Sequence, residues 1–172
     1  MFTKDELREK AKQIRSLLEM DQISEKIVEN LRSAEIYDVA QNIMIFYPLE
    51  HEINLLPLLE DNKKIYLPKV QGDELVVCPY KPGDELVDSK FKTKEPVSEP
   101  VSPDILDMMF IPALMVDKNF NRLGYGCGFY DRFLLKNELK AIKIVPIPSL
   151  LIVDNLPSDE FDAQFDIILD EL

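Results

Sequence analysis

The chain has 172 residues, of which 46% are hydrophobic and 30% charged, and its formal net charge is −12. This length and composition predict one soluble globular domain over residues 1–172 and exclude disordered, fibrous and coiled-coil proteins. The acidic balance argues against binding to nucleic acids or membrane surfaces, so an anionic small ligand would require a local basic patch or a metal ion.

The first predicted element is a helix that begins at a capping-box pattern formed by Thr3 and Glu6. Apolar residues then recur at helical spacing and give one apolar face: Leu7, Ala11, Ile14, Leu17 and Leu18. Basic residues lie near a second stripe, which by itself predicts a solvated basic face: Lys4, Arg8, Lys12 and Arg15. A second helix is expected to begin near Asp21 or Ser24.

The segment from Asn42 to Tyr47 is short, apolar and rich in residues that favour strands. It predicts a buried strand, which ends at Pro48. Apolar runs and turn residues predict the next elements: a short helix over 55–59 capped by Asn54, strands over 64–70 and 74–80, and turns over 71–73 and 82–84.

The polar, proline-rich stretch 88–103 predicts a long surface loop. The nearly continuous apolar run 107–114 predicts a central strand that is covered on both faces. A helix over 130–137 and strands over 141–146 and 166–169 complete the chain. Strands alternate with helices, so we expect a three-layer, Rossmann-like α/β fold with a mostly parallel central sheet and helices on both faces.

Glycines are rare in this chain, yet three of the five, Gly124, Gly126 and Gly128, fall in one short window. Alternate glycines let backbone N–H groups approach an anion closely, and the following helix N-terminus adds positive potential. The window lacks the third glycine of a dinucleotide-binding motif, because Phe129 holds that position, and it lacks the Gly-Lys-Ser/Thr of a P-loop. A tight strand-to-helix turn is the alternative interpretation.

The longer string R-L-G-Y-G-C-G-F-Y-D-R, residues 122–132, resembles the signature R-L-G-x-G-x-G-Y-Y-D-R of the 5-formyltetrahydrofolate cyclo-ligase family. Shorter segments resemble other elements of that family in the same order: 4–8, 47–54, 80–84, 95–96, 111–117 and 156–166. The resemblance covers essentially the whole chain.

The resemblance implies an ATP- and Mg²⁺-dependent conversion of 5-formyltetrahydrofolate to 5,10-methenyltetrahydrofolate, with release of ADP and phosphate. A formamide oxygen is a poor leaving group, and transfer of the γ-phosphoryl group of ATP makes it a good one. Such a reaction needs positioning and charge neutralisation rather than a protein nucleophile. This agrees with a chain whose only histidine is His51 and which shows no Ser/His/Asp arrangement.

The resemblance also implies roles for individual residues. The predicted ATP-binding residues are Lys4, Arg8, Arg122, Leu123, Gly124, Tyr125, Gly126, Cys127, Gly128, Phe129 and Tyr130. Tyr47, Glu52 and Phe129 are predicted to bind the folate, with Glu52 accepting hydrogen bonds from the pterin. Arg122 and Asp131 are the predicted catalytic residues, and Asp131 and Asp162 the predicted Mg²⁺ ligands.

Several positions depart from the family pattern. Phe129 lacks the usual phenol, and Phe161 replaces a His or polar residue before Asp162. Tyr125 and Cys127 fill variable positions that are basic in some relatives, so the phosphate site is expected to be less positive. A non-catalytic folate- or nucleotide-binding module therefore remains an alternative, as does another activity on a similar scaffold, such as a sugar-phosphate isomerase.

Localisation and partners follow from what the chain lacks. Cys78 and Cys127 lie far apart, which argues against a disulfide framework or a zinc site. The N-terminus is too charged for a signal peptide, and the longest apolar stretch, 108–116, is too short to span a bilayer. We expect a cytoplasmic monomer whose partner is its folate substrate.

Overall fold

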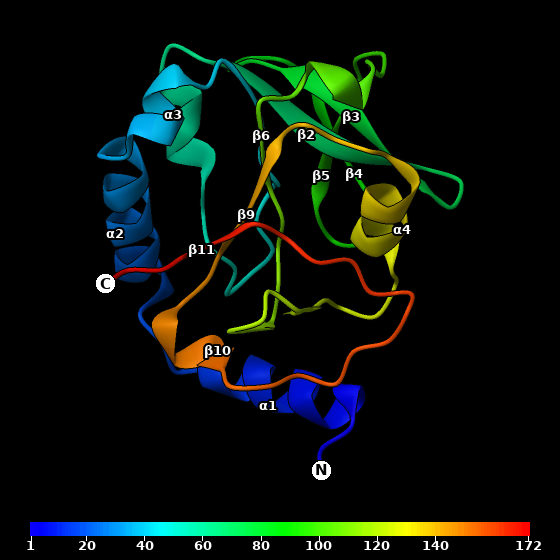
Figure 1. Ribbon diagram of the computed structural model, residues 1–172. Helices are drawn as coiled ribbons and strands as arrows, with labels where there is room; N and C mark the ends of the chain where they lie inside the picture. Colours follow the sequence, from blue (N-terminus) through cyan, green and yellow to red (C-terminus); the bar gives the residue numbers. More distant parts are fainter.

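The centre of the computed structural model, which describes residues 1–172, is a six-stranded sheet with the order β11-β9-β6-β1-β2-β3 (Figure 1). Neighbouring strands are parallel, except that β2 and β3 form an antiparallel pair. The six strands are β1 (Asn42–Met44), β2 (Lys64–Gln71), β3 (Glu74–Tyr80), β6 (Met108–Phe110), β9 (Ile142–Pro146) and β11 (Ile167–Leu169).

Helices cover both faces of this sheet: α1 (Lys4–Ser16), α2 (Met20–Arg32), α3 (Glu35–Val39) and α4 (Phe129–Lys136). Successive strand residues point to opposite faces, so Ile43 joins a buried cluster with residues of α2 and α3, and Met44 joins one with residues of α1 and α4. In Figure 1, α2 and α3 lie on one side of the sheet and α4 on the other. The predicted three-layer α/β architecture is therefore confirmed.

The capping box at the start of α1 is present as predicted. The Thr3 hydroxyl accepts a hydrogen bond from the Glu6 backbone N–H at 3.2 Å, and the Thr3 backbone N–H donates to Glu6 Oε1 at 3.1 Å. The residues of the basic stripe on the same helix differ in burial, because Lys12 is exposed whereas Arg15 is only 4% exposed. The prediction of a solvated face was therefore wrong for Arg15.

The apolar run 107–114 is not one strand, which corrects the prediction. β6 ends at Phe110, and the chain passes through Pro112 into β7 (Met115–Asp117) of a second, three-stranded sheet with the order β10-β7-β8. Proline has no N–H to donate to a ladder, so it ends the pairing although every neighbour is buried. The other two strands of this sheet are β8 (Arg122–Leu123) and β10 (Ile152–Val153).

The stretch 88–103 is more ordered than a surface loop. It contains most of a hairpin formed by β4 (Leu86–Asp88) and β5 (Lys94–Pro96), and Val101 pairs with Val77 of β3. Three short 3₁₀ helices complete the chain: η1 (Leu56–Glu60), η2 (Pro103–Ile105) and η3 (Ser149–Leu151). The Leu56 N–H donates to the Asn54 side chain at 3.0 Å, but the N-cap of η1 is Leu55, so Asn54 lies one residue before the cap position that was predicted for it.

The turn between β7 and β8 is organised by Asp117, which is 1% exposed. Its carboxylate accepts hydrogen bonds from the backbone N–H groups of Asn119, Asn121 and Leu156 and from the Asn121 side chain, at 2.9–3.0 Å. Burial opposes ionisation, but these hydrogen bonds hold the pKa of Asp117 below its usual range. Asp117 therefore joins the β7–β8 turn to the segment that follows β10.

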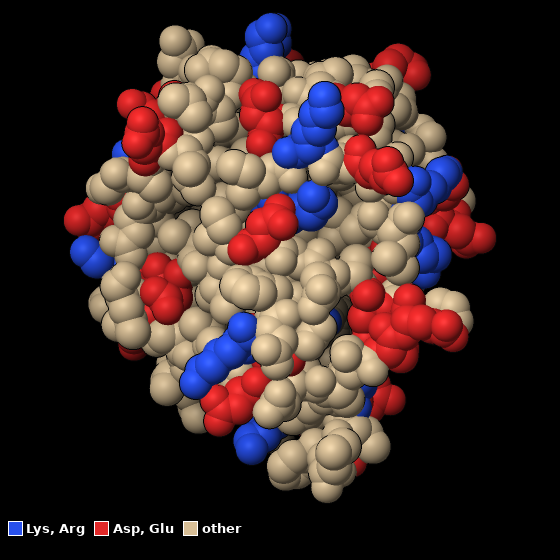
Figure 2. Space-filling model, in the orientation of Figure 1, with Lys and Arg blue, Asp and Glu red and all other residues tan.

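None of the helices is both long and apolar enough to cross a membrane. The face shown in Figure 2 carries acidic and basic side chains interspersed. The single domain and the monomeric state stay predictions.

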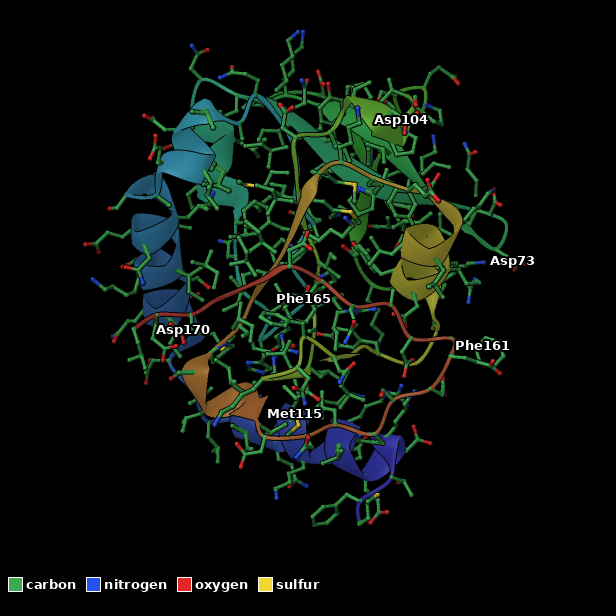
Figure 3. All side chains as sticks on the ribbon, in the orientation of Figure 1. Asp73, Asp104, Met115, Phe161, Phe165 and Asp170 are labelled. Atoms are coloured by element: carbon green, nitrogen blue, oxygen red, sulfur yellow. The ribbon has the colours of Figure 1, made fainter.

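We predict that Asp117→Ala lowers the free energy of unfolding by about 2–4 kcal/mol, because it leaves buried N–H groups without acceptors. Urea unfolding at neutral pH measures this. Asp104→Ala is the matched control, since Asp104 is exposed at the molecular edge and its side chain makes no hydrogen bond (Figure 3). Equal unfolding midpoints for the two variants would contradict the prediction.

Candidate active site

A cavity of about 520 Å³ opens where the carboxyl ends of β1 and β6 meet. The strand that follows β1 in the sheet, β2, lies on one side of the β1–β6 pair, and the strand that follows β6, β9, lies on the other side. The gap between β1 and β6 is therefore a topological switch point, the place where α/β sheets bind ligands. Every residue with a predicted site role lines this cavity: Lys4, Arg8, Tyr47, Glu52, Arg122, Leu123, Gly124, Tyr125, Gly126, Cys127, Gly128, Phe129, Tyr130, Asp131 and Asp162.

The glycine loop, residues 124–128, has a conformation that needs its glycines. Gly126 and Gly128 have φ angles of 109° and 73°, in the left-handed region. A Cβ on Gly128 would lie 2.7 Å from Arg132 Nη1, and one on Gly124 would lie 3.0 Å from Arg122 Nη1. Gly128 is also the N-cap of α4, so the loop leads directly into a helix N-terminus that favours anions.

Three cationic side chains surround this loop. Arg8 Nε donates to the Gly124 carbonyl at 2.9 Å, and Arg132 Nη1 donates to the Cys127 carbonyl at 2.8 Å. Lys4 Nζ lies 2.7 Å from Asp162 Oδ2 and 3.3 Å from Asp159 Oδ2. The helix α1 therefore brings Lys4 and Arg8, one turn apart, to the same side of the loop.

Arg122 and Asp131 form a buried ion pair beneath the loop, with Arg122 Nη2 3.3 Å from Asp131 Oδ1. Arg122 Nη1 also donates to the Pro112 carbonyl at 2.7 Å, whereas its buried Nε has no hydrogen-bond partner. The guanidinium carbon lies 5.7 Å from the centre of the Tyr130 ring. These contacts fix Arg122 between the end of β6 and the start of α4.

The two predicted metal ligands lie near each other in space although they are far apart in sequence. The Ala163 N–H donates to Asp131 Oδ1 at 3.1 Å, so the residue next to Asp162 is held against the start of α4. No group of three or more His, Cys, Asp or Glu side chains forms a metal cage. Two carboxylates beside a phosphate loop fit Mg²⁺, which takes its remaining ligands from phosphate oxygens and water.

The cavity is also lined by a buried carboxylate, that of Glu52, which is 8% exposed. Glu52 Oε1 accepts the Leu49 N–H at 2.7 Å, and Oε2 accepts the Tyr125 hydroxyl at 2.9 Å. Burial raises the pKa of Glu52, and these two hydrogen bonds only partly offset the effect. Glu52 is therefore a buried acceptor with few partners of its own.

Aromatic side chains border the same part of the cavity. Phe129 packs edge-on against Phe91, with ring centres 5.3 Å apart, and Arg132 lies 4.9 Å from the centre of the Phe129 ring. Tyr47 lines the cavity, and its carbonyl accepts the Thr93 hydroxyl at 3.0 Å. Phe161, on the loop that carries Asp162, lies at the outer edge of the molecule (Figure 3).

Sequence reasoning missed two contributors to the site. Phe91 lies in the stretch predicted as a surface loop, where a single aromatic residue gave no signal. Arg15 belongs to the predicted basic stripe, and its Nη1 donates to the Tyr125 hydroxyl at 2.6 Å while its Nε donates to the His51 carbonyl at 2.7 Å. The spacing of Arg15 from Arg8, seven residues or two helical turns, was the available signal.

Together, the fold and the cavity define an α/β protein in which a glycine-rich loop at a helix N-terminus and a buried carboxylate line the same pocket. Comparison with known proteins identifies the family. The model of the 5-formyltetrahydrofolate cyclo-ligase family matches residues 1–171, and the chain belongs to this family. This confirms the predicted family and, with it, the predicted class of enzyme, a ligase of folate metabolism.

Individual relatives agree along the whole chain. A 5-formyltetrahydrofolate cyclo-ligase from Haemophilus influenzae is 28% identical, over 96% of this chain and 97% of that protein. A solved structure of the Aquifex aeolicus 5,10-methenyltetrahydrofolate synthetase is 32% identical, with a TM-score of 0.85 over 99% of this chain and 90% of that one. A synthetase structure from Mycoplasma pneumoniae, 23% identical with a TM-score of 0.80 over 99% and 100% of the two chains, shares the fold.

We predict that Glu52→Gln becomes more stable relative to the wild type as the pH rises from about 4 to 7. The raised pKa of Glu52 means that the folded state favours the protonated carboxyl. That contribution is complete below the unfolded-state pKa and is lost as pH rises through the folded-state value. Urea unfolding of both proteins at several pH values measures the difference, and a difference that is independent of pH would refute the burial argument.

Proposed function

We propose that this protein converts 5-formyltetrahydrofolate to 5,10-methenyltetrahydrofolate with hydrolysis of ATP to ADP and phosphate. The observation that carries the proposal is one cavity in which a phosphate loop and a buried carboxylate face each other. Family membership and the names of the relatives from Haemophilus influenzae and Aquifex aeolicus support the same reaction.

In this proposal the triphosphate lies against the loop 124–128 and is neutralised by Lys4, Arg8 and Arg122. The pterin lies against Tyr47 and Phe129, with its N–H donors directed to Glu52. The γ-phosphoryl group is transferred to the formyl oxygen, the neighbouring ring amine attacks the activated carbon, and phosphate leaves. The protein contributes position and charge, which is what phosphoryl transfer mainly needs.

The ion pairs of the cavity support a role for Mg²⁺. Lys4 is paired with Asp162 and Arg122 with Asp131, so two of the three proposed phosphate-binding cations are balanced by the carboxylates that a metal would need. Bound Mg²⁺ neutralises charge on the phosphoryl group being transferred. We propose that Asp131 and Asp162 contact the nucleotide-bound metal, directly or through water.

The deciding experiment follows the absorbance of 5,10-methenyltetrahydrofolate after mixing the protein with 5-formyltetrahydrofolate, ATP and Mg²⁺, each omitted in turn. Product formation that requires all three supports the proposal. Binding of both ligands without turnover would favour the non-catalytic module instead. Absence of both binding and product would overturn the proposed reaction.

We predict that Arg8→Ala raises the apparent KM for ATP about tenfold or more, because it removes a cation from the phosphate loop and the hydrogen bond to Gly124. Steady-state kinetics with varied ATP measure this. Lys12→Ala is the matched control on the same helix, since Lys12 is exposed and does not line the cavity. Unchanged ATP kinetics in Arg8→Ala would show that Arg8 does not bind ATP and would favour the alternative interpretation of the basic stripe.

We predict that Asp131→Asn lowers kcat at least about tenfold, which corresponds to about 1.4 kcal/mol of transition-state stabilisation, and raises the Mg²⁺ concentration needed for half-maximal rate. Asn keeps an oxygen for the Ala163 N–H but loses the charge that pairs with Arg122, so urea unfolding of the variant is measured alongside to show that it is folded. Asp73→Asn is the control, because the Asp73 side chain is exposed at the edge of the molecule (Figure 3). Wild-type rates and Mg²⁺ dependence in Asp131→Asn would exclude the metal role.

A further inference from the structure

Tyr125 makes a hydrogen-bonded bridge that the proposed reaction does not by itself require. Its hydroxyl accepts a hydrogen bond from Arg15 Nη1 at 2.6 Å and donates one to Glu52 Oε2 at 2.9 Å. Arg15 and Glu52 are both buried, whereas the Tyr125 residue is 37% exposed and lines the cavity. The hydroxyl is therefore fixed between a buried cation and a buried anion while the side chain remains in contact with the ligand space.

Tyr125 and Glu52, which this bridge joins, lie in the proposed binding sites of two different ligands. Tyr125 lies between Gly124 and Gly126, inside the loop proposed to hold the triphosphate. Glu52 belongs to the segment that follows β1, lines the same cavity and is the proposed acceptor for the pterin. A single hydrogen bond, Tyr125 Oη to Glu52 Oε2, thus connects the nucleotide loop directly with the folate pocket.

The bridge also orients the Glu52 carboxylate. A carboxylate has about four acceptor sites, and the Leu49 N–H and the Tyr125 hydroxyl occupy one on each oxygen. This arrangement fixes the plane of the carboxylate and leaves acceptor sites for a ligand. Any displacement of the loop that moves Tyr125 therefore changes the orientation of Glu52, and a ligand held by Glu52 restrains the loop.

We propose that Tyr125 is a positioning residue that couples nucleotide binding to folate binding. The inference rests on the proposed function. A folate bound to Glu52 holds the carboxylate, and through Tyr125 the loop, in one conformation, so ATP then binds to a loop that is already ordered. Because coupling between two sites is reciprocal, bound nucleotide increases the affinity for folate by the same factor.

Tyr125 is well suited to this role for two reasons. Its neighbours Gly124 and Gly126 give the loop the conformational freedom that a coupling element needs, and Gly126 has a φ angle of 109°. Arg15 limits that freedom at one point, because its Nε is fixed by the His51 carbonyl at 2.7 Å. The hydroxyl of Tyr125, next to Glu52, is thus one restraint on the loop, beside the hydrogen bonds that Arg8 and Arg132 donate to the Gly124 and Cys127 carbonyls.

The test compares the dissociation constant of 5-formyltetrahydrofolate with and without a saturating non-hydrolysable ATP analogue and Mg²⁺. In the wild type we expect folate to bind about fivefold or more tightly with the nucleotide. In Tyr125→Phe, which loses only the hydroxyl, we expect the ratio to fall close to one. Arg15→Gln removes the guanidinium that donates to the same Tyr125 hydroxyl and is expected to lower the ratio as well.

Tyr37→Phe is the matched control. The Tyr37 hydroxyl donates to Asp61 Oδ2 at 2.6 Å, so the substitution breaks the same kind of hydrogen bond away from the cavity, and the ratio is expected to stay at the wild-type value. A merely structural role for Tyr125 would lower stability in both tyrosine variants and leave the ratio unchanged.

The outcomes separate this inference from the proposed function. Wild-type protein that binds neither ligand would overturn both. If the wild-type protein turns over substrate but its affinity ratio is one, the coupling alone is overturned and the reaction stands. The same holds if Tyr125→Phe has the same affinity ratio as the wild type.

Discussion

The arrangement of the cavity depends on one buried ion pair, Arg122 with Asp131. Arg122 holds the end of β6 through the Pro112 carbonyl, and Asp131 holds the C-terminal segment through the Ala163 N–H. Central sheet, phosphate loop, α4 and C-terminal segment therefore meet at two side chains that are 4% and 15% exposed. Because a buried pair gains little net stability but costs about 3–5 kcal/mol when one partner is lost, its main contribution is position.

The loop also gathers cationic side chains in a chain whose net charge is −12. Arg8 Nε and Arg132 Nη1 donate to carbonyl oxygens of the loop itself, those of Gly124 and Cys127, and Arg8 Nη1 also pairs with Asp5 Oδ1 at 2.7 Å. Carbonyl partners fix a guanidinium without neutralising it. Arg132 donates only to the backbone carbonyls of Cys127 and Asp73, so it keeps its charge beside the loop, and the helix N-terminus that follows adds positive potential.

Local signals in the sequence predicted the fold well wherever one residue determines the backbone. The capping box at Thr3, the glycine string and the turn at Gly83 are examples, because their geometry depends on short-range sterics and hydrogen bonds. The prediction of one strand over 107–114 was wrong because a buried crossover and a buried strand have the same composition, and only Pro112 distinguished them. The prediction that Arg15 is solvated was wrong for a different reason, because its burial depends on Tyr125 and His51, which are distant in sequence.

The buried carboxylates of the molecule differ in a way that separates scaffold from site. Asp117 accepts four hydrogen bonds, and its pKa stays low although burial opposes ionisation. Glu52 is also buried, with 8% of its surface exposed, but it accepts only two hydrogen bonds, and burial raises its pKa. Folding alone would favour a saturated carboxylate or an apolar side chain at such a position. A buried acceptor with unused capacity, facing a cavity, is instead what a ligand rich in N–H donors requires.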